Sequence, residues 1–136
     1  MKILRVLATV LAVYVGLALV FDSLVGYFQP GNDVLRVFDA EGKPYDRVLS
    51  VIEDGDQLWG VSGHHFRGWY HRVKANPDVE LIRSGVSKPY RAVVLDDPET
   101  KAHVIGVMKS GSATDYYVSR ALLLFAPVKP VRLDPR

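Results

Sequence analysis

The residues with the clearest potential for chemistry lie between Ser62 and Lys74, where polar, cationic and aromatic side chains are interleaved. Ser62 and Gly63 are expected to join a strand to a helix, and a helix N-terminus presents free backbone N–H groups to anions. A glycine at this junction lets the backbone approach a ligand closely. The junction, which continues through His64 and His65, therefore predicts an anion-binding loop. The alternative is a plain connection with exposed histidines.

A short amphipathic helix is predicted to follow over residues 66–75. Its apolar face has the spacing i, i+3, i+4 and i+7 and consists of Phe66, Trp69, Tyr70 and Val73. Its basic face consists of Arg67, His71 and Lys74. Such a face could bind phosphate or an acidic tail, could rest on anionic lipid, or could simply be solvated, and these three readings stay open. The Asn76-Pro77 pair ends the helix, because a residue before proline is disfavoured in the α region.

The aromatic residues on this helix have different expected roles. Trp69 is interpreted as a core residue, since large aromatics at helical spacing are usually buried. Tyr70 is the better candidate for a ligand contact, because a buried phenol hydroxyl needs a polar partner. No metal site is expected: the four histidines match no zinc spacing, and the chain has no cysteine.

The segment from Trp69 to Val79 also carries a resemblance to a known family. It reads Trp-Tyr-His-Arg-Val-Lys-Ala-Asn-Pro-Asp-Val and resembles a helix of the deazaflavin-dependent nitroreductases, which commonly have Trp-Tyr-x-Asn-Leu-x-Ala-Asn-Pro-x-Val there. These are small split β-barrel reductases that use the coenzyme F-420. The resemblance covers residues 42–133, and residues 69–77 are its specific part. It implies a coenzyme site that would include Ser62, Gly63, His64, Arg67, Tyr70 and Lys74.

The resemblance extends to a tyrosine and departs at a loop. Tyr116 matches a tyrosine-bearing segment near the family's substrate pocket, where a phenol could donate a proton to a quinone or nitro oxygen; packing of Tyr116 and Tyr117 at the barrel mouth is the alternative. The family's Gly-Arg-x-Ser-Gly-x-x-Arg, which holds the coenzyme phosphate, is missing from residues 39–47. Only Gly42, Lys43 and Arg47 could replace it, and acidic residues at 39 and 41 would repel a phosphate.

The resemblance implies a reductase that passes a hydride from reduced deazaflavin to a quinone, with a nitro or enone compound as an adventitious acceptor. The alternative is a cofactor-free split-barrel module that binds or scaffolds at the membrane. Flavin mononucleotide or haem binding is a weaker option. A net charge of +2 over 136 residues gives no reason to expect a nucleic-acid partner. The oligomeric state is open.

The N-terminal region predicts a single-pass membrane anchor over residues 1–28, followed by a linker at 29–33. Residues 7–21 form an unbroken apolar run, and a spanning helix needs about 20 residues of this character. A cleaved signal peptide is the rival reading, but the small-x-small site Gly16-Leu17-Ala18 lies inside the apolar run, which favours an anchor. Lys2 and Arg5 would place the domain outside, whereas the coenzyme is cytoplasmic, so the side stays open. Membrane lipid is an expected partner.

Residues 34–136 predict one α+β domain, a mainly antiparallel split β-barrel with two or three short helices. Strands are expected at 34–38, 47–53, 57–62, 79–82, 90–95, 122–128 and 131–133, and Pro127 and Pro130 suggest that the last two lie at an edge. Asp54-Gly55 predicts a hairpin turn. Asp97 and Pro98 predict the N-cap and first residue of a helix that reaches about residue 109. A short helix is expected at 115–120.

Overall fold

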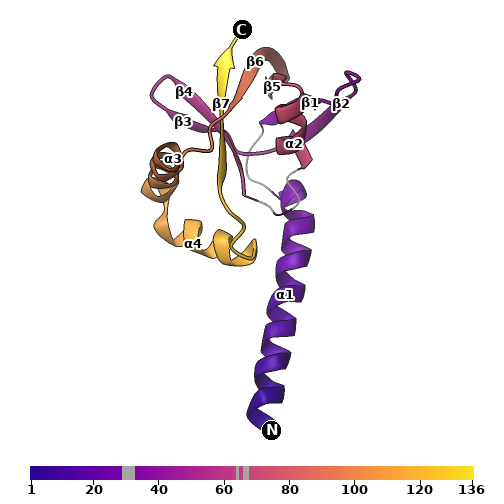
Figure 1. The fold of residues 1–136 in the computed structure, drawn as a ribbon, viewed down its shortest axis with the longest axis vertical. Helices are drawn as coiled ribbons and strands as arrows, with labels where there is room; N and C mark the ends of the chain where they lie inside the picture. Colours follow the sequence, from indigo (N-terminus) through magenta and orange to yellow (C-terminus); the bar gives the residue numbers. More distant parts are fainter. Residues whose placement is uncertain (29–32, 64, 66–67) are drawn as a thin grey trace.

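The computed structural model describes residues 1–28, 33–63, 65 and 68–136, and the side chains of residues 22, 23 and 25–28 lie outside this description. The helices in the described residues are α1 (Lys2–Phe28), α2 (Gly68–Ala75), α3 (Pro98–Gly111) and α4 (Ala113–Leu122). The strands are β1 (Val34–Phe38), β2 (Pro44–Val48), β3 (Ile52–Asp54), β4 (Gln57–Ser62), β5 (Asp78–Arg83), β6 (Val86–Val94) and β7 (Lys129–Pro135). Figure 1 shows α1 projecting away from a domain built around the strands.

The strands form one seven-stranded antiparallel sheet that curls into a half-barrel, in the order β2-β1-β5-β6-β7-β4-β3. Three hairpins supply most of the pairing, and β7 closes the sheet by pairing with both β6 and β4. Gly55 has a φ of 62°, as the tight turn between β3 and β4 requires. The predicted fold class is confirmed: an antiparallel split barrel with short helices follows an apolar N-terminal helix.

The concave face of the sheet packs on α2. The alternation of β1, β5 and β7 turns one side of each strand toward a common core. Its buried members are Leu35, Val37, Leu49, Trp69, Tyr70, Val73, Val79, Leu81, Ala92, Val131 and Leu133. Trp69, Tyr70 and Val73 of the predicted apolar face are therefore buried as expected, whereas Phe66 lies outside the described residues. This packing holds α2 against the sheet beside β1 (Figure 1).

The two helices before β7 begin at well-formed caps. Asp97 caps α3 by accepting a hydrogen bond from the Thr100 N–H at 2.8 Å, and Pro98 is the first helical residue, as predicted. Ser112 then caps α4 by accepting from the Asp115 N–H. Because a single residue separates α3 from α4, the chain turns sharply there, and α4 lies below the sheet in Figure 1.

Three strand predictions are wrong. The run 47–53, expected as one strand, is the end of β2 and the start of β3, which lie at opposite ends of the strand order, and residues 49–51 between them are not in a strand. Residues 122–128 form the end of α4, a turn and an extended connection, because Leu124 and Phe125 adopt φ values near +52° and +53° that no strand allows. β7 is an interior strand rather than an edge strand. It tolerates Pro130 because the β6–β7 ladder starts one residue later, at Val131, so the missing N–H interrupts no pairing with β6.

The helix α1 is the one helix in the described residues that is long and apolar enough to cross a membrane, by length and composition alone. The qualifying stretch is Lys2–Phe21, and only 6% of it is buried within the protein. Its covered side is narrow: Ala18 is buried and Tyr14 is half-buried against α4, where the Tyr14 hydroxyl donates to the Ala121 carbonyl. Low burial argues against a core helix of a soluble protein.

Candidate functional site

The last residue of β4 places an unpaired hydroxyl inside the half-barrel. Ser62 is completely buried, and its Oγ has no hydrogen-bond partner in the described residues. Its neighbour across the sheet is Lys129 on β7. A buried hydroxyl without a partner loses about 1–3 kcal/mol of solvation free energy. Such a group is a candidate ligand contact, since a ligand could supply the missing hydrogen bond.

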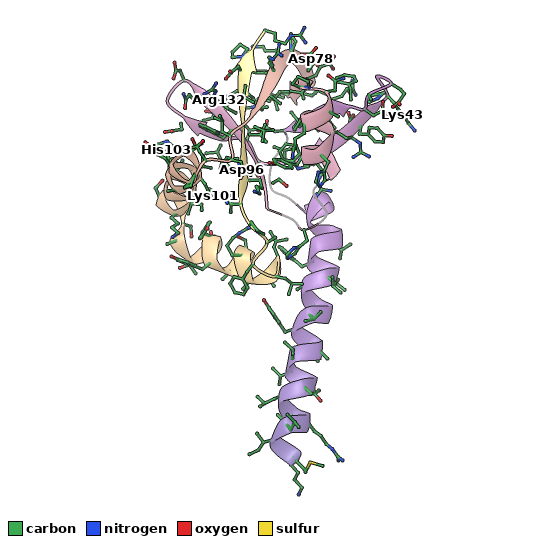
Figure 2. All side chains as sticks on the ribbon, viewed as in Figure 1. Lys43, Asp78, Asp96, Lys101, His103 and Arg132 are labelled. Carbon is green, nitrogen blue, oxygen red and sulfur yellow. The ribbon has the colours of Figure 1, made fainter. Side chains whose placement is uncertain are left out.

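Lys129 belongs to a charged cluster at this end of the barrel. Its Nζ contacts both carboxylate oxygens of Asp96, at 2.7 and 2.8 Å. The hydrogen bond from Lys129 lowers the pKa of Asp96 below its ordinary value, and the charges of Lys101 and Lys74 act in the same direction. Figure 2 shows Asp96 and Lys101 near the start of α3. The pair is exposed enough to exchange partners with an entering ligand.

Gly63 continues from Ser62 and is held by a buried arginine. Arg120 on α4 is 8% exposed, and its Nη1 donates to the Gly63 carbonyl at 3.3 Å and to the Ala126 carbonyl at 2.9 Å. A Cβ atom at Gly63 would lie 2.4 Å from Arg120 Nη2, closer than real contacts permit. A larger residue at this position would have to displace the Arg120 guanidinium, which is a reason for glycine that the sequence did not reveal.

The loop after Gly63 is also tied to the turn that follows α4. A ring nitrogen of His65 lies 3.2 Å from the Leu124 carbonyl oxygen. Together with the Arg120 bonds, this contact joins the β4–α2 junction to the end of α4 across two long-range links. The junction is thus held at two points by the end of α4, as expected of a preorganised binding loop.

The helix α2 presents different side chains to its two flanks. Tyr70 is 4% exposed and belongs to the core, with the Trp69 ring edge-on at 6.3 Å. Lys74 is exposed, and its Nζ lies 5.6 Å from the centre of the Tyr70 ring. Lys74 also acts electrostatically on Asp96. This flank therefore faces the Ser62 and Lys129 cluster.

The opposite flank of α2 lines a pocket of about 360 Å³ beside the β1–β2 turn. Its lining comprises Asp39, Ala40, Gly68, His71, Arg72 and Ala75. The guanidinium of Arg72 lies 3.8 Å from the centre of the Tyr45 ring, a stacked cation–π contact. Arg72 has no carboxylate within ion-pair distance among the described residues. Among the described lining residues, Arg72 is thus the cation available to an anionic ligand, and Asp39 is a competing carboxylate.

That carboxylate closes the β1–β2 turn. Asp39 Oδ1 accepts hydrogen bonds from the backbone N–H groups of Glu41 at 3.0 Å and Lys43 at 2.8 Å. The Gly42 N–H donates to the Asp39 carbonyl, and Gly42 has a φ of 84°. The backbone donors of residues 41–43 are therefore satisfied inside the turn. Figure 2 places Lys43 at the tip of this turn, far from Asp96.

Tyr116 is half-buried on α4, one helical turn before Arg120. Its ring meets that of Tyr117 edge-on at 5.3 Å, and Lys109 Nζ lies 5.1 and 4.9 Å from the two ring centres. The hydrogen bond to Tyr117 raises the pKa of Lys109 above its ordinary value. Tyr116 thus lies beside the Lys109 ammonium.

The structure brings together only part of the predicted site. Ser62 and Gly63 stand at the end of β4, and Tyr70 and Lys74 lie on α2, whereas Tyr116 lies on α4 beside Tyr117 and Lys109. His64 and Arg67 lie outside the described residues, so their predicted roles stay predictions. The sequence reasoning missed the residues Lys129, Asp96 and Arg72. In the described residues no group of three His, Asp or Glu side chains could hold a metal ion.

Residues 30–123 match the sequence profile of the family described as F420H(2)-dependent quinone reductase. No curated protein is a significant sequence match to this chain. The matched segment runs from before β1 to the end of α4 and leaves out β7, so it includes the Ser62 junction, the Asp39 turn and Tyr116 but not Lys129. The resemblance that the Trp-Tyr helix predicted is confirmed by this match.

Solved structures share the fold at low sequence identity. The haem storage protein HutZ from Vibrio cholerae has a TM-score of 0.61 and 16% identity, covering 79% of this chain and 84% of HutZ. An F420-H2 dependent reductase, FDR-A, has a TM-score of 0.58 and 19% identity, and the match covers 75% of this chain and 92% of the FDR-A chain. A putative pyridoxamine 5'-phosphate oxidase from Listeria innocua has a TM-score of 0.54 and 16% identity, and the match covers 86% of this chain and 94% of the Listeria chain. These likenesses concern the split-barrel architecture.

Proposed function

Since the chain belongs to the F420H(2)-dependent quinone reductase family, we propose that it is a membrane-attached reductase that transfers a hydride from the reduced deazaflavin coenzyme F-420 to a quinone dissolved in the bilayer. Membrane attachment rests on α1, whose apolar stretch is almost entirely uncovered. A nitro or enone compound would be an adventitious acceptor of the same hydride. The family relation supports the coenzyme, and the chemistry of the residues below supports its place in this chain.

The observation that carries the proposal is the buried, unpaired Oγ of Ser62 on the concave wall beside Lys129. A planar ring with carbonyl and ring-nitrogen groups would supply the hydrogen bond that Ser62 lacks, and Lys129 would stabilise partial negative charge on that ring. The donor set thus fits a deazaflavin ring. Gly63, His64 and Tyr70 are proposed to border the same ring from the junction and α2.

The acidic tail of the coenzyme needs cations, and α2 carries them. Arg72 is stacked on Tyr45 and has no carboxylate partner among the described residues, so it is preorganised to meet an anion at the pocket beside the β1–β2 turn. Lys74 and Arg67 are proposed to hold phosphate or glutamate groups along the same helix. The turn itself does not fit a phosphate, because its backbone N–H groups at Glu41 and Lys43 already donate to the Asp39 carboxylate. The tail is therefore proposed to bind from the helix side.

When bound, the reduced coenzyme supplies the hydride and becomes oxidised. The quinone gains that hydride and one proton to form a quinol. Tyr116 is proposed to donate the proton to a quinone oxygen and to regain it from water, with Lys109 stabilising the phenolate between these events. Arg120 and Gly63 hold the junction in place, and the core around Trp69 excludes water from the ring side.

The test is a fluorescence titration of the full chain in lipid nanodiscs with the oxidised coenzyme, with flavin mononucleotide run in parallel. We expect micromolar binding of the deazaflavin and an increase of about tenfold in Kd for Arg72→Gln, the loss expected for one charge-assisted hydrogen bond. Arg91→Gln is the matched control, since Arg91 is an exposed arginine on β6 and should leave the Kd unchanged. No deazaflavin binding up to about 1 mM, roughly 4 kcal/mol of affinity, would exclude the reductase.

One observation favours the alternative of a cofactor-free membrane module. The carboxylate of Asp39 occupies the position in the β1–β2 turn where the family's phosphate-binding residues are expected. If this turn had kept only its structural role, the domain would bind neither deazaflavin nor flavin mononucleotide. The titration separates the two functions: loss of both ligands supports the module, and selective binding of the deazaflavin supports the reductase.

A further inference from the structure

The segment from Tyr116 to Val128, here called the α4 segment, has an unusual surface. Its exposed apolar side chains are Tyr117, Val118 and Phe125, at 57%, 52% and 68% exposure. The only charged residue between Tyr116 and Val128 is Arg120, and Arg120 is buried. A solvent-exposed helix normally carries charges on its outer face. The α4 segment therefore presents an uncharged, partly aromatic surface that nothing in the described chain covers.

The position of α4 relative to α1 indicates what covers this surface. Tyr14 of α1 donates a hydrogen bond to the Ala121 carbonyl at the end of α4, and Ala18 is buried nearby. The apolar stretch of α1 reaches Phe21. At 1.5 Å per residue, Tyr14 lies about 10 Å inside the end of that stretch. If the stretch spans a bilayer, the end of α4 lies about 10 Å below the edge of the hydrocarbon, the greatest depth that interfacial helices reach.

The orientation of α4 suits this depth. Figure 1 shows α4 lying across the direction of α1, beneath the sheet and on the side toward the α1 N-terminus. A helix that lies in the plane of the interface buries one apolar face in lipid and turns the other toward its own domain. Tyr116 and Tyr117 near its beginning are residue types enriched at membrane interfaces, and Lys109 beside them can meet lipid phosphate.

The backbone of the turn after α4 is also compatible with lipid. The N–H groups of residues 123, 124, 125 and 126 donate to the carbonyls of Ser119, Ala121, Arg120 and Leu123. Irregular backbone tolerates an apolar surrounding only when its polar groups are paired internally. This turn meets that condition for its donors. Leu124 and Phe125 adopt positive φ values, an uncommon conformation for apolar residues, and this places Phe125 on the outer surface.

We propose that the α4 segment is a lipid-docking surface that rests in the interfacial region of the bilayer holding α1, with Val118 and Phe125 in contact with acyl chains. This inference rests on the proposed membrane attachment through α1. Its consequence for the reaction is direct. Arg120 joins the α4 segment to Gly63, so the proposed lipid-facing surface adjoins the β4–α2 junction, and we expect a quinone dissolved in the bilayer to approach the junction from this side.

The absence of cysteine makes the test clean, because a single introduced cysteine carries the only spin label. Val118→Cys and Phe125→Cys would be labelled in the full chain in phosphatidylcholine–phosphatidylglycerol vesicles. Leu11→Cys in α1 is the lipid reference, and Asp56→Cys in the exposed β3–β4 turn is the aqueous reference. The measurement is the ratio of collisions with oxygen, which concentrates in lipid, to collisions with a water-soluble nickel chelate.

We expect the labels at Val118 and Phe125 to favour oxygen, as the Leu11 label does, and the Asp56 label to favour the nickel chelate. Labels at Val118 and Phe125 that follow Asp56 while Leu11 stays in lipid would overturn the docking surface and leave membrane attachment intact. A nickel preference at Leu11 as well would overturn membrane attachment itself, and the docking surface with it. Low collision rates with both reagents, together with spin–spin broadening, would show that a second copy of the chain covers the segment, against the proposal.

A functional arm uses the proposed reaction. Phe125→Asp should abolish reduction of a long-tailed quinone in vesicles while leaving reduction of a short, water-soluble quinone unchanged, because a carboxylate on this surface keeps it out of lipid. Glu41→Gln on the distant β1–β2 turn is the control for a change of one charge. An equal loss for both quinones after Phe125→Asp would contradict lipid docking as the route of the acceptor.

Discussion

The β4–α2 junction and the β1–β2 turn lie on either side of α2, yet they satisfy their polar groups in opposite ways. At the junction the hydroxyl of Ser62 is buried and has no partner in the described residues, and Lys129 lies opposite it on β7. At the turn the Asp39 carboxylate accepts from two backbone N–H groups, and a third is bonded to the Asp39 carbonyl. The junction therefore has a hydrogen-bonding group left for a ligand, whereas the backbone donors of residues 41–43 in the turn are already bonded within it.

This difference shows how one barrel can keep part of a binding site and change another part. A group that is bonded internally contributes to folding and has nothing further to offer a ligand. A buried group without a partner is unfavourable in the empty protein and gains when a ligand arrives. The ring end of the proposed coenzyme site therefore depends on the junction, and the tail end depends on Arg72 rather than on the turn. Four substitutions can break or sharpen this comparison.

The largest effect is expected for Gly63→Ala. Its added Cβ would lie 2.4 Å from Arg120 Nη2, so either the guanidinium leaves its two carbonyl partners or the junction shifts. Overpacking of this kind destabilises by about 1–3 kcal/mol and should also abolish coenzyme binding. Thermal unfolding in detergent, followed by circular dichroism, gives the stability. Gly106→Ala on α3 is the matched control, since its Cβ meets nothing within 4 Å; it should be neutral or stabilise by up to about 1 kcal/mol. Equal stability of the two variants would mean that Arg120 does not clamp the junction.

A trade-off between stability and binding is expected for Ser62→Ala. The substitution removes a buried hydroxyl that has no partner, so the empty protein should gain up to about 1 kcal/mol of unfolding free energy. Binding of the coenzyme should weaken by about tenfold, the loss of one hydrogen bond in a buried site. Ser119→Ala is the control, because the Ser119 hydroxyl already donates to the Tyr116 carbonyl at 2.8 Å, and its loss should lower stability slightly. A destabilised Ser62→Ala protein with unchanged affinity would remove Ser62 from the site.

Charge rather than shape is tested by Asp39→Asn. An asparagine oxygen can still accept from the N–H groups of Glu41 and Lys43, so the turn should keep its conformation. Loss of the negative charge beside the pocket should improve coenzyme affinity by about threefold at low salt, and the gain should shrink as salt is added. Asp56→Asn, in the β3–β4 turn, makes the same change of charge away from the pocket and should leave the titration unaltered. Improved affinity in both variants would point to net charge and not to the turn.

The elements that the sequence predicted well are those defined by local patterns. The apolar spacing of Trp69, Tyr70 and Val73 depends on residues within two turns, and the structure buries all three. The Asp97-Pro98 start of α3 and the Asp54-Gly55 turn are equally local signals. The strand predicted over 122–128 failed because a short apolar run is compatible with a buried strand, a helix end or a turn. Tertiary packing, not periodicity, decides among these.

The candidate site was predictable only where its residues are neighbours in the sequence. Ser62 and Gly63 were found because a glycine after a strand is a local signal. Lys129 was not, because its place beside Ser62 depends on the register of β7 against β4. The role of Asp39 in closing the β1–β2 turn could have been predicted from the sequence. An aspartate followed three residues later by glycine is typical of a turn in which the side chain bonds the backbone. The sequence reading treated Asp39 only as a repulsive charge.

The smallest effect is expected for Asp96→Asn, which tests whether the ion pair with Asp96 keeps Lys129 from interacting with the coenzyme. Lys129 is paired with Asp96, and the hydrogen bond from Lys129 lowers the pKa of that carboxyl below its ordinary value. The stability from such a pair is fully present above the unfolded-state pKa, about 3.9, and is lost as the pH falls through the lower folded-state pKa. Between pH 5 and 8 the carboxylate therefore stays charged and Lys129 stays paired.

Coenzyme affinity of the wild-type chain should not vary over this range through Asp96, whereas Asp96→Asn should free Lys129 and raise affinity by about twofold at every pH in it. Binding titrations at pH 5, 6.5 and 8 measure both quantities, and Asp134→Asn on the outer face, whose partner is Arg132, is the control. A gain in wild-type affinity between pH 8 and 5 that Asp96→Asn eliminates would show that Asp96 titrates within this range and that the pairing with Lys129 is weaker than its geometry indicates.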